Sequence, residues 1–109
     1  MPRKSHAGSL FVWLALASAA FAVSGCAKLK ARDDLNKGVE AYKNAQFDRA
    51  IEYFKDAQAN DPKLMNARLY LGTAYASQYI PGAPSDENKR NGEAAIQVFK
   101  QVLQDDPNN

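Results

Sequence analysis

A pattern that occurs twice, about 45 residues apart, constrains the fold of this chain more than any other feature. Each copy has an alanine and an isoleucine, then a phenylalanine, then an Asp-Pro pair: Ala50-Ile51, Phe54 and Asp61-Pro62 in the first copy, and Ala95-Ile96, Phe99 and Asp106-Pro107 in the second. A period of this length predicts one structural unit used twice, whose copies stack and share a core.

The spacing of apolar residues predicts that each unit is a pair of helices. Apolar side chains recur at every third or fourth position, and no stretch alternates for long enough to favour a strand. We expect four helices, with these residues on their buried faces: Leu35, Gly38, Val39 and Tyr42; Ala50, Ile51, Phe54 and Ala57; Leu64, Ala67, Leu71, Ala74 and Tyr75; and Ala95, Val98, Phe99, Val102 and Leu103. The fold class that follows is all-α.

Two of the connections between these helices carry recognisable turn residues. Pro62 suits the first position of a helix, and Asp61 would be the N-cap of that helix. A longer turn is expected over residues 77–91, where Pro81-Gly82 indicates a tight turn. Ser85 within it would cap a final helix that begins early.

The arrangement resembles the tetratricopeptide repeat, a helix-turn-helix unit that stacks into a solenoid. The family pattern is carried by Gly38, Phe47, Ala50, Phe54, Ala57 and Pro62 in the first unit, and by Leu71, Gly72, Tyr75, Ala95, Phe99 and Pro107 in the second. The resemblance covers residues 31–109 and implies two repeats, 33–62 and 64–107, within a domain over 33–109. It also implies that Phe54 and Phe99 fill equivalent gaps between helices, so we expect them to contribute about equally to stability.

The first unit departs from the family pattern on one face. Asp34 and Lys37 stand where the family usually has a large aromatic residue and a leucine. We therefore expect the outer face of the first unit to be solvated, as in a capping repeat.

The opposite end of the array is expected to be apolar. The sequence ends where a third unit would begin, and Val98, Val102 and Leu103 lie on the final helix. Exposed apolar surface of this kind favours association, so we expect a possible homo-oligomer of residues 27–109. In the competing interpretation, Ala94 and the turn over 77–91 fold back and cover the edge.

Ahead of the repeats, the stretch Val23-Ser24-Gly25-Cys26 resembles the lipobox of bacterial lipoproteins. In that family an aliphatic residue, a small residue, and Gly or Ala precede the cysteine. The stretch closes an apolar run over residues 10–23, which is too short for a membrane span of about 20 residues. Arg3 and Lys4 supply the basic start that is typical of a signal peptide.

The lipobox resemblance implies several properties of the mature protein. Residues 1–25 would be a signal peptide, with cleavage between Gly25 and Cys26 and acyl chains such as palmitate on Cys26. The protein would then be lipid-anchored in a bacterial cell envelope, at the outer membrane and facing the periplasm. The alternative is an inert, buried cysteine that follows a signal anchor.

The mature chain would carry few groups suited to chemistry. Removal of Arg3 and Lys4 reduces Lys and Arg from 14 to 12, which equals the 12 Asp and Glu residues, so nucleic-acid binding is not expected. The one histidine, His6, would be removed with the signal peptide. The one cysteine, Cys26, would be lipidated. We expect no enzymatic activity, metal or cofactor beyond the covalent lipid. Residues 26–32 would be a basic tether or, alternatively, the first turn of a helix.

In tetratricopeptide proteins the first helix of each unit lines a concave groove that holds a peptide or a partner helix. The resemblance assigns this partner-binding groove to Arg32, Leu35, Val39, Tyr42, Lys43, Asn66, Leu69, Thr73 and Ser77. Its apolar strip and basic edge would suit a segment with apolar anchors and an acidic group. The alternative is that these residues only pack between helices.

The function that these features favour is a membrane-tethered scaffold that binds protein or peptide partners at the cell envelope. One alternative is a structural subunit of an envelope assembly, such as an outer-membrane insertion, pilus or secretion complex. Another alternative is that the chain is the N-terminal fragment of a longer repeat protein.

Overall fold

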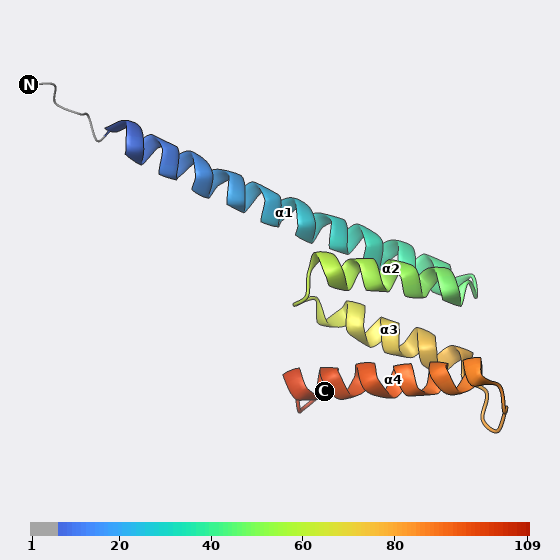
Figure 1. Cartoon of the computed structure of the whole chain (residues 1–109). Coiled ribbons are helices and arrows are strands. Elements are labelled where there is room, and N and C mark those ends of the chain that lie inside the picture. Colours follow the sequence, from blue (N-terminus) through green and yellow to red (C-terminus); the bar gives the residue numbers. More distant parts are fainter. Residues whose placement is uncertain (1–6) are drawn as a thin grey trace, which may run out of the picture.

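The computed structural model describes residues 7–109, although side chains are described for only some of the residues before Ser24. It has four helices, α1 (Ala7–Lys43), α2 (Phe47–Asn60), α3 (Met65–Gln78) and α4 (Asp86–Asp105), shown in Figure 1. The described residues contain no strand, which confirms the all-α fold class. Arg3, Lys4 and His6 lie outside the described residues.

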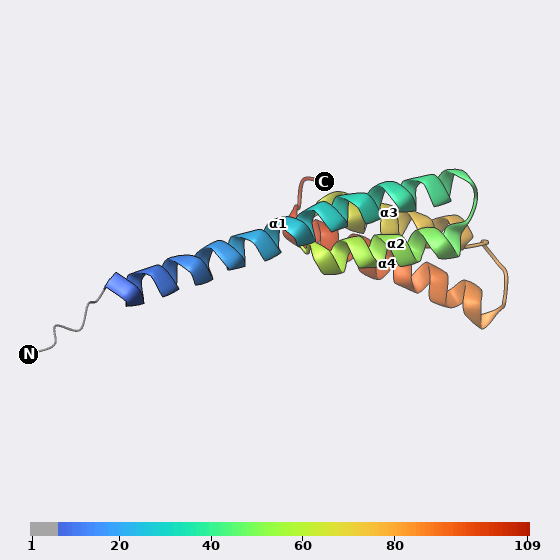
Figure 2. The same ribbon diagram turned by 90° about the horizontal axis from the view of Figure 1, so that it is seen from above.

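The helices form two antiparallel pairs that stack side by side. α1 packs along α2, α3 packs along α4, and α2 and α3 join the pairs, whereas α1 and α3 meet at few residues. Figures 1 and 2 show the stack from two directions. This confirms the expected two-repeat, tetratricopeptide-like arrangement. It also leaves a gap between α1 and α3, and side chains of α2 lie at the bottom of this gap.

In both repeats a glycine on the first helix receives the ring of a phenylalanine on the second. A Cβ atom at Gly38 would overlap the ring of Phe54, and one at Gly72 would lie 2.6 Å from Cε1 of Phe99. Because no larger residue fits either place, the glycines set how closely the paired helices approach. The equivalent packing confirms the repeat alignment. The two rings differ in burial, however: Phe54 is 1% exposed, while Phe99 is partly exposed.

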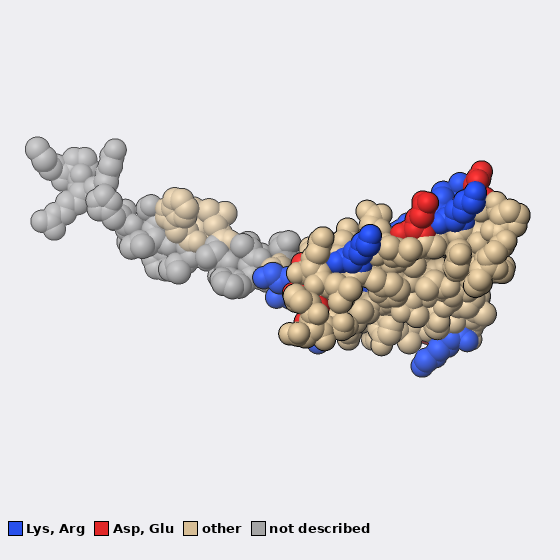
Figure 3. All heavy atoms as spheres, turned by 90° about the horizontal axis from the view of Figure 1, so that it is seen from below, with Lys and Arg blue, Asp and Glu red and all other residues tan. Residues whose placement is uncertain are grey.

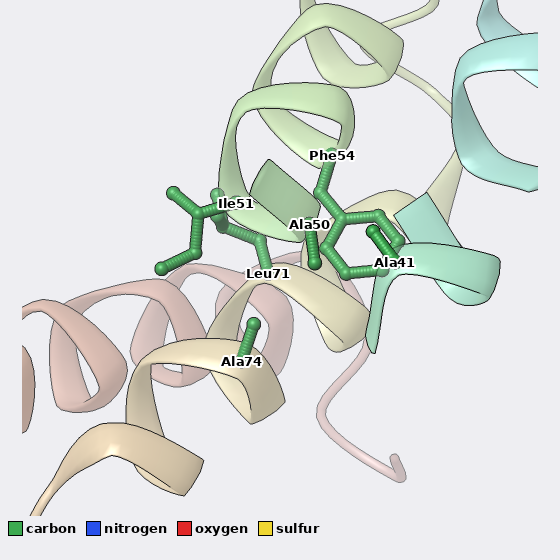
Figure 4. Packing of buried hydrophobic residues seen from close by; sticks show 6 residues of the cluster. All are labelled: Ala41, Ala50, Ile51, Phe54, Leu71 and Ala74. Atoms are coloured by element: carbon green, nitrogen blue, oxygen red, sulfur yellow. The ribbon is translucent and has the colours of Figure 1, made fainter. Parts of the chain in front are cut away.

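The core lies where the two repeats join (Figure 4). Its cluster contains Ala41, Ala50, Ile51, Phe54, Leu71 and Ala74, with Val39, Tyr42 and Val98 among the side chains packed around it. Most members of the cluster are small, so the helices approach closely and Phe54 supplies much of the volume. The core therefore depends on contacts between repeats as well as on contacts within each repeat.

The α1–α2 turn is a Schellman motif that is closed by an alanine. The amide of Gln46 donates to the carbonyl of Ala41 at 2.9 Å, and the amide of Ala45 donates to the carbonyl of Tyr42 at 2.9 Å. Ala45 has a φ of 57°, in the left-handed region that glycine usually occupies in this motif. The tight turn directs α2 back along α1. Ala45 keeps a strained backbone in this turn.

The expected N-cap at Asp61 is wrong. Asp61 instead ends α2, and its amide donates to the carbonyl of Ala57. Its side chain accepts a hydrogen bond from the amide of Lys63 at 3.2 Å, and α3 begins only at Met65. The physical reason is the turn that follows Asp61: the amide of Leu64 donates to the carbonyl of Asp61 at 3.1 Å, so the residues after Pro62 complete a turn before the helix begins.

The expected turn over 77–91 is shorter in the structure. α3 continues to Gln78 and α4 begins at Asp86, so the loop covers only residues 79–85 and residues 86–91 belong to α4. Ser85 caps α4 as predicted, and its Oγ accepts from the amide of Asn88 at 3.1 Å. The tight turn at Pro81-Gly82 is also confirmed, with Gly82 at a φ of 82°.

A buried asparagine holds this loop against α4. Asn88 is 6% exposed, and its side chain accepts from the amide of Ile80 at 2.7 Å. The same side chain donates to the carbonyls of Ile80 and Ala83 at 2.8 and 3.1 Å. The loop is therefore anchored by polar contacts, and Tyr79 and Ile80 remain exposed on it.

The expected solvation of Asp34 is also wrong. Asp34 is 5% exposed and accepts hydrogen bonds from Lys30 at 2.9 Å and from Asn60 at 3.4 Å. In the second repeat, Arg68 and Asp105 occupy the equivalent positions and form an ion pair. Each repeat thus has a polar contact between its first helix and the end of its second. The partners of Asp34 offset the cost of burying its carboxylate.

The N-terminal half of α1 projects away from the stacked helices (Figures 1 and 2). Residues 26–32 are helical and lie well inside α1 instead of forming its first turn, and Ala31 is fully buried. Of the described residues, none before Ala31 is buried. No described helix is both long and apolar enough to cross a membrane.

Candidate functional site

A small apolar cavity opens between the first helices of the two repeats. Val39 and Tyr42 of α1 line one side, Tyr70 and Thr73 of α3 line the other, and Phe54 of α2 forms the floor. The cavity has a volume of about 140 Å³. Because α1 and α3 meet at few residues, these side chains leave a space between the two helices.

Aromatic rings give the cavity its shape. The rings of Phe54 and Tyr70 lie 5.7 Å apart between centroids in a tilted arrangement. The rings of Tyr42 and Phe47 pack edge to face at 5.2 Å. These contacts restrict the rotation of Tyr42 and Tyr70, so the walls are held in place before any ligand arrives.

Hydroxyl groups close one end of the cavity. The hydroxyl oxygens of Tyr42 and Ser77 lie 2.7 Å apart and share a hydrogen bond between α1 and α3. The hydroxyls of Ser77 and Thr73 also bond to their own helix, at the carbonyls of Thr73 and Leu69. The proton of each hydroxyl is therefore already donated, with Tyr42 as the donor to Ser77, so these neutral oxygens can only accept hydrogen bonds from a ligand.

The structure brings together four of the nine predicted groove residues. Val39, Tyr42 and Thr73 line the cavity, and Ser77 lies at its end. Leu35 and Leu69 are partly buried outside the lining, and Leu35 packs against the core. The three remaining residues, Arg32, Lys43 and Asn66, are exposed and do not line the cavity.

Sequence reasoning missed Tyr70 and the role of Phe54 as the floor. Tyr70 is 42% exposed and lies one helical turn from Asn66 and Thr73, so a helical wheel could have placed it on the groove side. Phe54 was expected only as a core residue. Its second role follows from the gap between α1 and α3, because the ring lines this gap although it is only 1% exposed.

The end of the stack beside α1 is polar. Its hollow, of about 220 Å³, is lined by Lys37, Glu40, Ala41, Asn44, Gln46, Arg49 and Tyr53. A hydrogen bond from Lys37 to Asp33, 2.8 Å long, raises the pKa of the Lys37 ammonium above its usual 10.5. Arg49 lies over the ring of Tyr53 at 5.8 Å from its centroid. Of the two residues from which a solvated face was expected, Asp34 is buried and Lys37 is exposed.

Cys26 is exposed on α1 and free of disulfide bonds. It lies one helical turn and a residue before Ala31, the first buried side chain among the described residues. Within that same part of the chain, no cluster of three or more His, Cys, Asp or Glu residues is arranged to hold a metal ion.

Comparison of the chain with protein-family models, curated proteins and solved structures finds no match. The resemblances to tetratricopeptide repeats and to bacterial lipoproteins therefore rest on the residues of this chain. The site itself is defined by the cavity between α1 and α3.

Proposed function

We propose that this protein is a membrane-tethered scaffold that binds a partner protein or peptide in the groove between α1 and α3. The observation that carries the proposal is the apolar cavity of about 140 Å³ between α1 and α3. A cavity of about 150 Å³ with apolar walls is large enough for a benzene molecule. One leucine or phenylalanine side chain of a partner would therefore fill it.

The lining favours an apolar anchor over a charged one. Val39, Phe54 and the two tyrosine rings supply the walls, and the nearest polar groups are the neutral hydroxyls of Thr73 and Ser77. Arg32 and Lys43 lie outside the lining, so the acidic group expected in the partner has no counterpart inside the cavity. We infer that affinity rests on burial of the anchor, with hydrogen bonds at the rim fixing its direction.

The tether would be a lipid on Cys26, after cleavage between Gly25 and Cys26. Two observations support this part of the proposal: the cysteine is exposed, and every buried side chain among the described residues follows it. Cleavage would thus leave the packed repeats intact while placing the lipid next to them. Multiple acyl chains exceed the weak, reversible binding that a single chain gives.

A capture experiment from membranes tests the groove. The mature lipidated protein should retain a partner, and Thr73→Glu should lose that partner because it places a charge at the mouth of the cavity. Asn66→Glu is the matched control, since Asn66 is exposed on the same helix outside the lining. Capture by Thr73→Glu equal to that by Asn66→Glu would refute the groove as the binding site.

The same experiment with Cys26→Ser tests the tether. The variant should leave the membrane fraction and lose fatty-acid label, while its melting temperature stays the same. A labelled Cys26→Ser variant would show that lipid is attached elsewhere.

A further inference from the structure

Apart from the groove, the mature chain exposes large apolar side chains in two places. The first is α4 with the loop before it, where Ile96 and Leu103 are 57% and 47% exposed. The expected apolar edge is corrected here at two positions, because Val102 is buried and Val98 packs against the core. Residues 79–80 of the loop are themselves exposed, so the loop does not cover this edge.

The second place is Leu29, which lies one helical turn after Cys26. Its side chain is 71% exposed, the largest fraction among the large apolar side chains that the structure describes. Successive residues of an α-helix are rotated by about 100°, so Leu29 and the fully buried Ala31 point to nearly opposite sides of α1. Leu29 therefore faces away from the repeats.

Basic side chains surround Leu29. Lys28 precedes it, and Arg32 lies one helical turn from both. Neither cation has an ion-pair partner among the described residues, whereas Lys30 beside them pairs with Asp34. Figure 3 shows Lys and Arg side chains where the projecting segment meets the packed helices. An exposed leucine flanked by free cations is typical of a surface that meets anionic lipid.

The charge of the mature chain is unevenly divided along its length. Residues 26–37 carry four Lys or Arg and two Asp, whereas residues 38–109 carry eight Lys or Arg and ten Asp or Glu. An anionic surface would therefore attract the start of the mature chain and repel the rest of it. This asymmetry favours contact with lipid headgroups through residues 26–37.

The continuity of α1 places these side chains at the depth of the headgroups. The helix runs without a break from Cys26 to Lys43, so no flexible linker separates the lipid from the repeats. A lipid bonded to Cys26 holds that residue at the edge of the hydrocarbon, and the headgroup layer beyond it is about 5–8 Å thick. At 1.5 Å per residue, Leu29 lies about 4.5 Å and Arg32 about 9 Å along the helix axis. Helical side chains point back toward the N-terminus, which brings the Arg32 guanidinium into the same layer.

We propose that residues 26–32 form a contact surface for anionic phospholipid headgroups. Lys28 and Arg32 bind the phosphates, and Leu29 enters the boundary between headgroups and acyl chains. This inference rests on the lipid that is proposed for Cys26.

The contact is confined to the first two turns of the mature helix. Asp33 and Glu40 are exposed farther along α1, and an anionic surface would repel both carboxylates. Because α1 continues directly into the first repeat, the contact would hold the repeats at a set angle to the bilayer instead of leaving them to swing on a tether.

Fluorescence quenching in vesicles tests this contact with the mature lipidated protein. Trp13→Phe removes the one tryptophan of the sequence, so Leu29→Trp supplies the only indole in cut or uncut protein. Phosphatidylcholine that is brominated near the top of its acyl chains should quench the Leu29→Trp probe, and more strongly when phosphatidylglycerol is present. Asn36→Trp is the matched probe: Asn36 is exposed on α1 about 10 Å farther from Cys26, and it should stay unquenched.

Removal of charge tests the role of the two cations. A cation near an anionic surface contributes about fivefold to the binding equilibrium, so Lys28→Gln/Arg32→Gln should shift it by about 25-fold away from contact. Lys43→Gln/Lys89→Gln removes the same charge at the end of α1 and the start of α4, and it should leave the quenching unchanged. Equal quenching in neutral and anionic vesicles, no response to Lys28→Gln/Arg32→Gln, or equal quenching of both probes would each overturn the proposal.

Mass spectrometry of the same samples separates the two proposals. Missing lipid on Cys26 would refute the tether. The dependence of the quenching on phosphatidylglycerol and on the two cations decides the headgroup contact with or without that lipid.

Discussion

At the scale of single residues, the fold depends on two glycine–phenylalanine contacts. The resemblance to the repeat family implied that Phe54 and Phe99 fill equivalent gaps between helices, and the structure shows that each ring lies against a glycine with no room for a side chain. The sequence did not predict how differently Phe54 and Phe99 are buried. That difference arises from their neighbours: α3 covers the first repeat, while the described chain provides no helix over the second.

We expect Phe54→Ala to destabilise the protein about twice as much as Phe99→Ala. Truncation of a fully buried phenylalanine costs about 3–5 kcal/mol, and a partly exposed ring has less area to lose. Thermal unfolding followed by circular dichroism measures both changes. Equal losses would restore the expectation of equal contributions and would mean that Phe99 is covered in solution.

At the scale of elements, helices were easier to predict than their ends. Apolar periodicity located all four helices, and Ser85 marked the start of α4. The N-cap prediction at Asp61 was wrong because aspartate is common both at N-caps and in turns. Only the backbone conformation distinguishes these two roles. The buried positions of Asp34 and Asn88 depend on partners 26 and 8 residues away, so local pattern could not reveal them.

The α1–α2 turn offers a stabilising substitution. Ala45→Gly should raise stability by about 0.5–1 kcal/mol, because glycine adopts the left-handed conformation at C′ without steric cost. For a domain of this size the melting temperature should rise by about 2–6 °C. Ala59→Gly is the control: Ala59 is exposed on α2, and glycine there should lower stability. A lower melting temperature for Ala45→Gly would show that the turn has another conformation in solution.

At the scale of the whole molecule, the part of the chain before Cys26 differs in structure from the part after it. The helical segment before it projects from the body and contains the exposed apolar side chains Val12, Trp13 and Leu16, whereas the packed repeats begin after it. The general position of the groove was predictable from the repeat. The residues that line the groove were not predictable, because Tyr70 and Phe54 reach the cavity only when the helices have their observed separation.

Removal of residues 1–25 should leave the melting temperature of the repeats within about 2 °C of the full chain. The reason is that all buried side chains among the described residues lie at Ala31 or later. Unfolding of both forms in the same detergent makes the comparison. A large loss of stability would mean that the projecting segment packs against the repeats and is not a removable signal peptide.

The central claim, that a tethered protein holds a partner's apolar side chain between α1 and α3, is tested most directly by photo-cross-linking in living bacteria. A photoreactive phenylalanine analogue at Thr73 reports contacts at the cavity mouth, and the same analogue at Asn66 reports contacts outside it. The account predicts a discrete adduct with an envelope protein from position 73 only, and its loss in Cys26→Ser. Adducts of equal yield from both positions, or none from position 73, would contradict it.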